Sequence, residues 1–199
     1  MSNTTTTVLG LIKPTPGTSE PWDQVGINGN WDKIDSAIGT KASRFTTNTQ
    51  SNTTSETQQF GVTLAAGQIQ GAVHRMVAWG TYDNSASATT ITWRIKIGGV
   101  QITAIVQNTP ASLSTFAPWR IEFDLVVATT GVSGTWRGGM LHSVAPSAGA
   151  VNTFLAPGSA TTRDTTVTSV MEITAQWAAA SASNTIRCDA AYYHRITNA

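Results

Sequence analysis

The strictest constraint on the fold is the alternation of apolar and polar residues that runs through most of the chain from about residue 58. It is clearest over residues 90–97 (TITWRIKI), where every second side chain is apolar. Successive side chains of a β-strand point to opposite faces, so this pattern buries one face of a sheet and exposes the other. Gly98-Gly99 follows, and then a second run over 100–105. This arrangement predicts a tight hairpin, because the favoured turns need positive φ.

Similar runs predict about eight strands, over residues 59–64, 72–82, 90–97, 100–105, 121–127, 134–142, 166–177 and 185–196. In the last two, we expect these side chains to face the core: Val167, Met171, Ile173, Ala175 and Trp177, and then Ile186, Cys188, Ala190 and Tyr192. The longest interruption is 143–164, which is rich in Ala, Pro, Gly and Ser. Only 12% of residues are charged, which suits β-structure with neutral polar faces. The predicted fold is an all-β, eight-stranded antiparallel jelly-roll sandwich.

The N-terminal residues do not show this alternation and have a different pattern of apolar residues. Residues 20–38 predict a short helix with an apolar stripe that includes Trp22 and Trp31, and Gly39 supplies a stop. A helix this short is marginal alone in water, so its tryptophans need a surface, either on their own domain or on a neighbouring protein. We therefore divide the chain into an arm (1–40), a polar linker or extended crossing segment (41–57) and a sandwich (58–199).

Charge and hydropathy exclude several classes of protein. A net charge of +1 gives no electrostatic basis for binding nucleic acid or an anionic membrane. No apolar stretch approaches the length of a membrane span, and the N-terminus lacks the pattern of a signal peptide. We expect a protein that stays in a cytoplasm or leaves it by a route such as lysis. The single cysteine, Cys188, precludes an internal disulfide and is expected in the core.

No catalytic or metal-binding constellation stands out. His74, His142 and His194 lie in separate strand patterns without zinc-ligand spacing, although they could still converge in space. Glu122 and Asp124 share one face of a strand, roughly 7 Å apart, a separation that could suit a glycosidase. They lack a cleft signature or sugar-stacking neighbours. We therefore expect no enzyme, no cofactor and no metal.

The tryptophans leave a choice open. Most of the seven fall on the inward phase of strands and are expected in the core. Trp119, beside Pro118 at a strand entrance, belongs either to the core or to an interface, where aromatic residues are enriched. An exposed aromatic pair could also bind sugar.

Two sets of motifs resemble known phage proteins. The segments LGLIKPTPG (9–17), PWD (21–23) and INGNWDKID (27–35) are similar to the N-terminal motif of phage tail-fibre and virion-appendage proteins. The second set resembles tumour-necrosis-factor-like jelly rolls of phage structural proteins, and its segments are VAWGTY (77–82), APWRIE (117–122) and ASNTI (182–186). The resemblance implies a homotrimer whose N-terminal arms grip the virion while the sandwiches project.

The resemblance also implies a site and a function. The expected virion-attachment residues are Leu11, Pro14, Trp22, Ile27, Asn28, Asn30, Trp31 and Ile34. The expected function is that of a capsid decoration or head-fibre protein, assembled in the host bacterial cytoplasm and bound to other virion proteins, the major capsid protein above all. One alternative is a short tail fibre or minor tail protein that contacts the host surface, where a glycan would be the ligand. Another is a carbohydrate-binding or carbohydrate-active sandwich.

Overall fold

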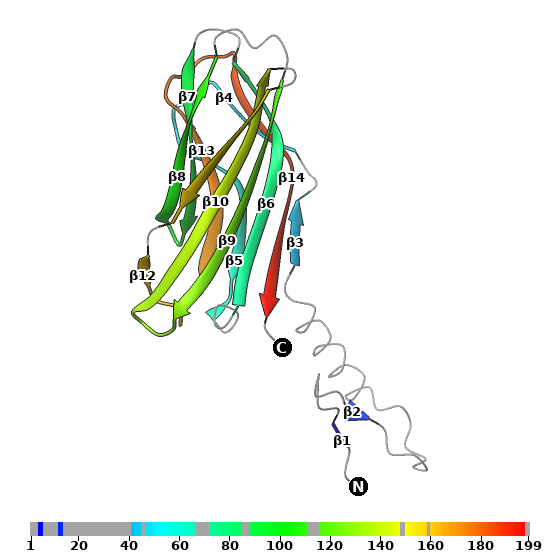
Figure 1. Ribbon diagram of the computed structural model, residues 1–199, viewed down its shortest axis with the longest axis vertical. Helices are drawn as coiled ribbons and strands as arrows, with labels where there is room; N and C mark the ends of the chain where they lie inside the picture. Colours follow the sequence, from blue (N-terminus) through cyan, green and yellow to red (C-terminus); the bar gives the residue numbers. More distant parts are fainter. Residues whose placement is uncertain are drawn as a thin grey trace.

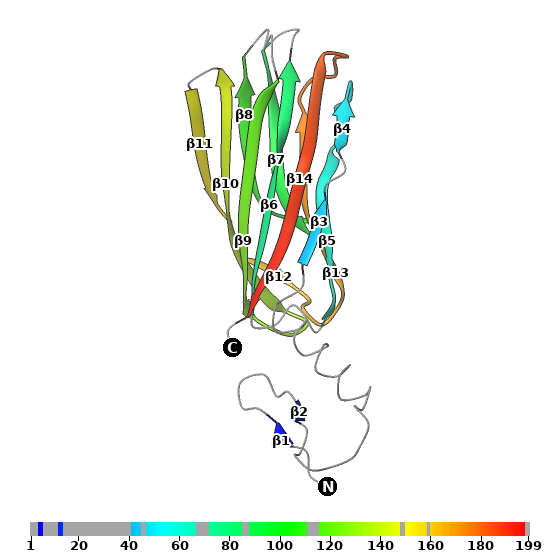
Figure 2. The ribbon, with the colours of Figure 1, turned by 90° about the vertical axis from the view of Figure 1, so that its right-hand side faces the viewer.

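The computed structural model describes residues 4–5, 12–13, 41–44, 47–66, 72–84, 88–110, 116–147, 150–158 and 160–197. Apart from the short pair β1 (Thr4–Thr5) and β2 (Ile12–Lys13), the strands of this part form two antiparallel sheets packed face to face (Figures 1 and 2). The helix expected over 20–38 and all eight expected attachment residues lie outside the described residues. Within the described part, no helix is long and apolar enough to cross a membrane.

The smaller sheet has four strands in the order β5-β13-β7-β8. Its strands are β5 (Thr57–Leu64), β13 (Ser169–Trp177), β7 (Thr89–Ile97) and β8 (Val100–Thr109). Gly98 and Gly99 join β7 to β8 with φ angles of 49° and 81°, which confirms the predicted hairpin and its need for positive φ.

The larger sheet has eight strands, in the order β11-β10-β9-β6-β14-β3, with β12 paired to β10 and β4 paired to β14. Its central strands are β10 (Gly134–Ser147), β9 (Ala117–Thr129), β6 (Ala72–Asn84) and β14 (Asn184–Thr197). The flanking strands are β11 (Ala150–Pro157), β12 (Thr161–Arg163), β3 (Lys41–Arg44) and β4 (Asn48–Ser51). The two sheets therefore hold more strands than the eight that the sequence predicts.

The core lies between the two sheets. The predicted inward set of β7 is confirmed, since its four apolar side chains are fully buried: Ile91, Trp93, Ile95 and Ile97. Trp93 of the smaller sheet packs on Trp119 of the larger sheet, with 4.6 Å between their ring centroids. Such aromatic pairs contribute beyond the area they bury, so this contact ties the sheets together.

The strands that the sequence missed lie at the edges of the larger sheet. The segment 41–57, interpreted as a linker or an extended crossing segment, contains β3 and β4, so the sheet begins before residue 58. The interruption expected over 143–164 contains β11 and β12. An edge strand with solvent on several sides needs no clean alternation, and β11 shows this, with Val151 70% and Leu155 77% exposed. Val167, expected to face the core, precedes β13 and is also exposed.

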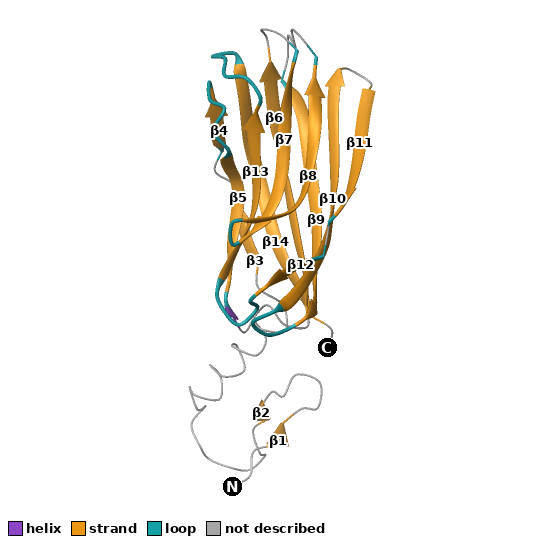
Figure 3. Cartoon of the chain, turned by 90° about the vertical axis from the view of Figure 1, so that its left-hand side faces the viewer, coloured by secondary structure: helices purple, strands orange, loops and turns teal. Residues whose placement is uncertain are grey.

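The two ends of the sandwich differ. Lys41, the first residue of β3, pairs with His194 near the end of β14, so the chain enters the sandwich at the end where it also leaves (Figure 1). Connections between strands lie at both ends, and the one between β13 and β14 lies at the opposite end (Figure 3). The sandwich therefore has an entry end and a distal end.

Candidate functional site

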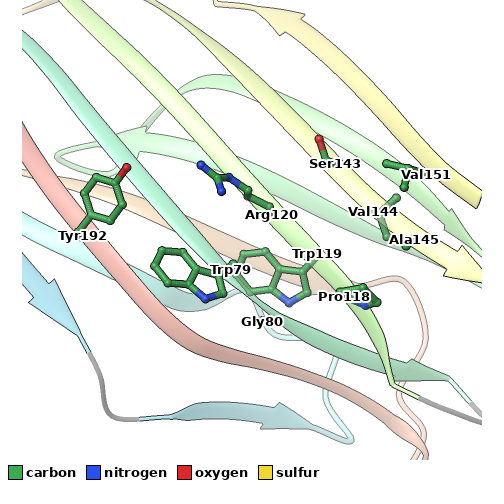
Figure 4. A pocket seen from close by; sticks show the side chains of 10 residues that line it. All are labelled: Trp79, Gly80, Pro118, Trp119, Arg120, Ser143, Val144, Ala145, Val151 and Tyr192. Carbon is green, nitrogen blue, oxygen red and sulfur yellow. The ribbon is translucent and has the colours of Figure 1, made fainter.

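The candidate site is a hollow of about 520 Å³ on the outer face of the larger sheet (Figure 4). Five neighbouring strands line it, from β14 across β6, β9 and β10 to β11. The residues that matter for its chemistry are Trp79, Gly80, Arg120, Ser143, Val151 and Tyr192. Its size lies in the range of small-ligand sites.

Trp79 presents its indole ring to this hollow because it falls on the outward phase of β6. Ala78 and Gly80 on either side face the core, whereas Trp79 is 38% exposed. The structure describes four other tryptophans, and each is at most 2% exposed: Trp93, Trp119, Trp136 and Trp177. An exposed indole is therefore particular to this site within the described part of the chain.

A β-bulge in β14 brings Tyr192 to the same face. Cys188 pairs with Gly80 and Ala190 pairs with Trp79, so Asp189 is an extra residue in the ladder. The extra residue reverses the phase of the strand. Ahead of the bulge the sequence prediction is confirmed, with Ile186 and Cys188 buried. Beyond it the prediction is wrong, because the buried residues are Ala191 and Tyr193, and Tyr192 is 38% exposed.

Gly80 permits the bulge. A Cβ atom at this position would lie 1.8 Å from the carbonyl oxygen of Arg187 and 2.9 Å from the Cα atom of Cys188. Only glycine allows β14 to approach so closely here. The Gly80 position and the bulge together determine that Tyr192 stands beside Trp79.

The two aromatic rings form a corner. Their centroids are 6.2 Å apart and their planes make an angle of 70°. The rings therefore meet edge to face and do not cover one another as a parallel stack would.

Polar groups continue the site across the sheet. Arg120 of β9 pairs in register with Trp79 of β6 on one side and with Ser143 of β10 on the other. The Nε atom of Arg120 lies 2.9 Å from Oε1 of Glu122, two residues along the same face, and the side chain of Arg120 remains 53% exposed. The site thus combines an apolar corner with an arginine that can donate hydrogen bonds and whose charge is balanced by Glu122, a residue outside the lining of the hollow.

A second ion pair lies further along the same face. Arg75 donates from Nε and one terminal nitrogen to the two carboxylate oxygens of Asp124, both at 2.7 Å. This hydrogen bonding, with the attraction of the carboxylate, raises the pKa of Arg75. Glu122 and Asp124, the carboxylates that suggested a glycosidase spacing, are therefore each held by an arginine.

Trp119, which the sequence left open between core and interface, lies in the core. It is 2% exposed, and its indole N–H faces the carbonyl oxygens of Thr81 and Arg187 at 3.3 and 3.2 Å. Trp119 and Val144 are on the buried phase, so at these positions strand backbone forms the floor of the hollow.

The three histidines have different surroundings. His74 is buried with its Nδ1 2.7 Å from the hydroxyl of Tyr193, and His142 is buried against aromatic rings, whereas His194 is partly exposed. Among the described residues, no group of three or more His, Cys, Asp or Glu side chains is placed to hold a metal ion.

Sequence reasoning missed Trp79 and Tyr192 as site residues. Around Trp79, apolar residues occupy both phases of the strand (MVAW, 76–79), so alternation does not indicate which side faces out. Tyr192 and Tyr193 are adjacent and chemically alike, and only the bulge decides between them.

Comparison of the chain with protein-family models, with curated proteins and with solved structures finds no match. The sequence motifs and the geometry of the hollow are therefore the features that point to a function.

Proposed function

We propose that this protein is a structural component of a phage virion, a capsid decoration or head-fibre protein that attaches through its N-terminal arm. The motif-bearing segment 9–35 supports attachment through its similarity to virion-appendage proteins. Its partners are other virion proteins, chiefly the major capsid protein.

The observation that carries this proposal is that the chain enters and leaves the sandwich at the same end. The arm precedes β3, and β3 pairs with the last residues of β14 at the entry end. An attachment segment at this end leaves the distal end of the sandwich directed away from the particle. This arrangement suits a domain that projects from a surface.

The strand order supports a jelly roll. After β4, the chain crosses between the sheets at each step to β5, β6 and β7, makes one hairpin to β8, and crosses back to β9. It crosses again into β13 and into β14. With β10 to β12 taken as an insertion, each sheet contributes four strands, β5-β13-β7-β8 and β4-β14-β6-β9, as a double-sheet jelly roll requires.

Exposed apolar side chains support contact between copies of the chain, and the resemblance to phage structural proteins implies that the copies number three. Leu155 on the edge strand β11 is 77% exposed, and Val126 and Leu141 on the same outer face are 44% and 37% exposed. β11 also carries no charged residue, although charges are a common protection of edge strands. Contact between copies through these residues would remove them from water.

The attachment role is tested by the double substitution Trp22→Ala and Trp31→Ala. Large aromatic anchors typically contribute about 2 kcal/mol or more each to an interface, so the variant should lose binding to particles that lack this protein. Co-sedimentation with depleted particles measures binding, and circular dichroism checks the fold.

The matched control is Trp79→Ala, which removes an exposed indole from the sandwich and should bind particles normally. Undiminished binding by the folded double variant would show that attachment does not depend on Trp22 and Trp31 of the arm.

Imaging of labelled protein on particles separates the possible locations on the virion, since label over the whole head supports decoration. Label at the tail tip would support the second candidate, a short tail fibre, which the aromatic hollow favours as a receptor-contacting surface.

A further inference from the structure

We infer that the hollow on the outer face of the larger sheet is a binding site for a neutral carbohydrate, with Trp79 and Tyr192 as its stacking surface. This goes beyond virion attachment and does not depend on it. The site lies on the sandwich, and the attachment proposal concerns the arm.

The aromatic corner is the first reason. A large indole ring is most stable when buried, as the other four described tryptophans are, yet Trp79 stands 38% exposed inside a concave surface. Tyr192 meets it at 70°, so the two rings form two walls. Sugar rings have apolar C–H faces that pack on aromatic faces, while their hydroxyl groups remain free to form hydrogen bonds at the rim.

The polar part of the hollow matches those hydroxyl groups. Trp79, Arg120 and Ser143 lie in one row across three adjacent strands. At the usual spacing of strands this row spans about 10 Å. Arg120 can donate to one sugar hydroxyl, and the hydroxyl of Ser143 can donate to or accept from another, while the contact of Arg120 with Glu122 at 2.9 Å holds the guanidinium in place.

Charge and backbone pairing narrow the class of ligand. Arg120 is neutralised by Glu122, so the site offers no surplus positive charge for a phosphate or an acidic sugar. The strands that carry the aromatic corner, β6 and β14, each have neighbours on both sides. Their backbone groups are therefore engaged in the ladder and cannot pair with an added peptide strand. A neutral saccharide is the occupant that these features favour.

The test uses the full-length protein on an array of neutral and acidic oligosaccharides, followed by calorimetric titration with the neutral oligosaccharide that gives the strongest signal. Trp79→Ala and Tyr192→Ala should each weaken that binding at least tenfold, with unchanged melting temperature and oligomer mass. Phe116→Ala is the matched control, because Phe116 is an aromatic residue that is 55% exposed and does not line the hollow. It should bind as the unaltered protein does.

Several results would overturn the inference. They are no binding to any neutral oligosaccharide at millimolar concentration, binding confined to acidic sugars, and equal binding by Trp79→Ala. A fall in oligomer mass in Trp79→Ala or Tyr192→Ala would also overturn it, because a second copy of the chain would then cover the hollow. Particle binding through the arm is measured separately, so failure here leaves the attachment proposal standing.

Discussion

His142 shows how a single buried side chain links this fold to pH. It lies on the inward phase of β10, with ring centroids 5.4 Å from that of Trp93 and 5.8 Å from that of Phe154. Neither ring nitrogen has a hydrogen-bond partner among the described residues. Burial without compensation disfavours the charged imidazolium and lowers the pKa of His142 from 6.5 to about 4.

The pKa of His142 predicts acid sensitivity. Because the folded pKa lies below the unfolded one, the unfolded chain takes up a proton first as the pH falls below 6.5. The free energy of unfolding should then decrease down to about pH 4 and level off below it, by about 3 kcal/mol in total. His142→Phe should lack this component, and urea unfolding of both proteins between pH 8 and 4 measures the difference. Parallel pH profiles would show that His142 is not buried as a neutral group.

Among the elements, β14 determines the most about the site. Its first half has the phase that the sequence predicts, and the bulge at Asp189 reverses the second half. The extra residue is accommodated because Gly80 of β6 leaves room for the backbone of Arg187. Gly80 and the bulged residue Asp189 thus decide which of the two adjacent tyrosines, Tyr192 or Tyr193, faces solvent.

Because β14 approaches β6 closely at Gly80, we expect that adding a single methyl group there destabilises the fold strongly. Gly80→Ala would place a methyl group 1.8 Å from the Arg187 carbonyl oxygen, so we expect a loss of at least about 2 kcal/mol in the free energy of unfolding. Gly139→Ala is the matched control on β10. Its added Cβ would have its nearest neighbour, the carbonyl oxygen of Ala156, at 3.8 Å, and the cost should stay under about 1 kcal/mol. Chemical denaturation compares the two, and equal midpoints would contradict the role of Gly80.

At the scale of the whole molecule, both outer faces of the sandwich combine ion pairs with exposed apolar side chains. The face of the smaller sheet carries Glu56, which accepts a hydrogen bond from Thr174 and forms ion pairs with Lys96 at 3.1 Å and Arg94 at 3.8 Å. Burial raises the pKa of Glu56, but these contacts outweigh it and hold the pKa below its usual value. The outer face of the larger sheet also carries ion pairs, Arg75 with Asp124 and Arg120 with Glu122, and its exposed apolar side chains include Leu141 and Leu155. What distinguishes the larger sheet is its edge strand β11, which carries no charged residue and exposes Leu155, and we propose that copies of the chain meet there.

The proposed trimer is tested on that face. The full-length protein should sediment at three times the mass of one chain at micromolar concentration, and Leu155→Glu should shift it toward the monomer by placing a charge in the contact. Val132→Glu, at a turn residue that is 73% exposed, is the matched control and should stay trimeric. A monomeric unaltered protein would contradict the trimer, and a trimeric Leu155→Glu variant would move the contact elsewhere.

What the sequence determined by itself is the local β-structure. The two-residue period over 90–97 and the glycine pair that follows specify a strand and its hairpin, because each depends only on near neighbours in the chain. The run over 121–127 depends on near neighbours in the same way, and its alternate residues Ile121, Phe123 and Leu125 are buried.

The tertiary structure alone decided the site and the edges. Trp119 is buried because Trp93 of the opposite sheet packs on it, whereas Trp79 is exposed because its side of the larger sheet faces away from that sheet. Tyr192 is exposed because β14 gains a residue opposite Gly80. β11 forms a strand because β10 supplies its hydrogen-bonding partners, although its own residues are mostly exposed. Each of these outcomes depends on contacts between residues far apart in the chain, which no local pattern of side chains records.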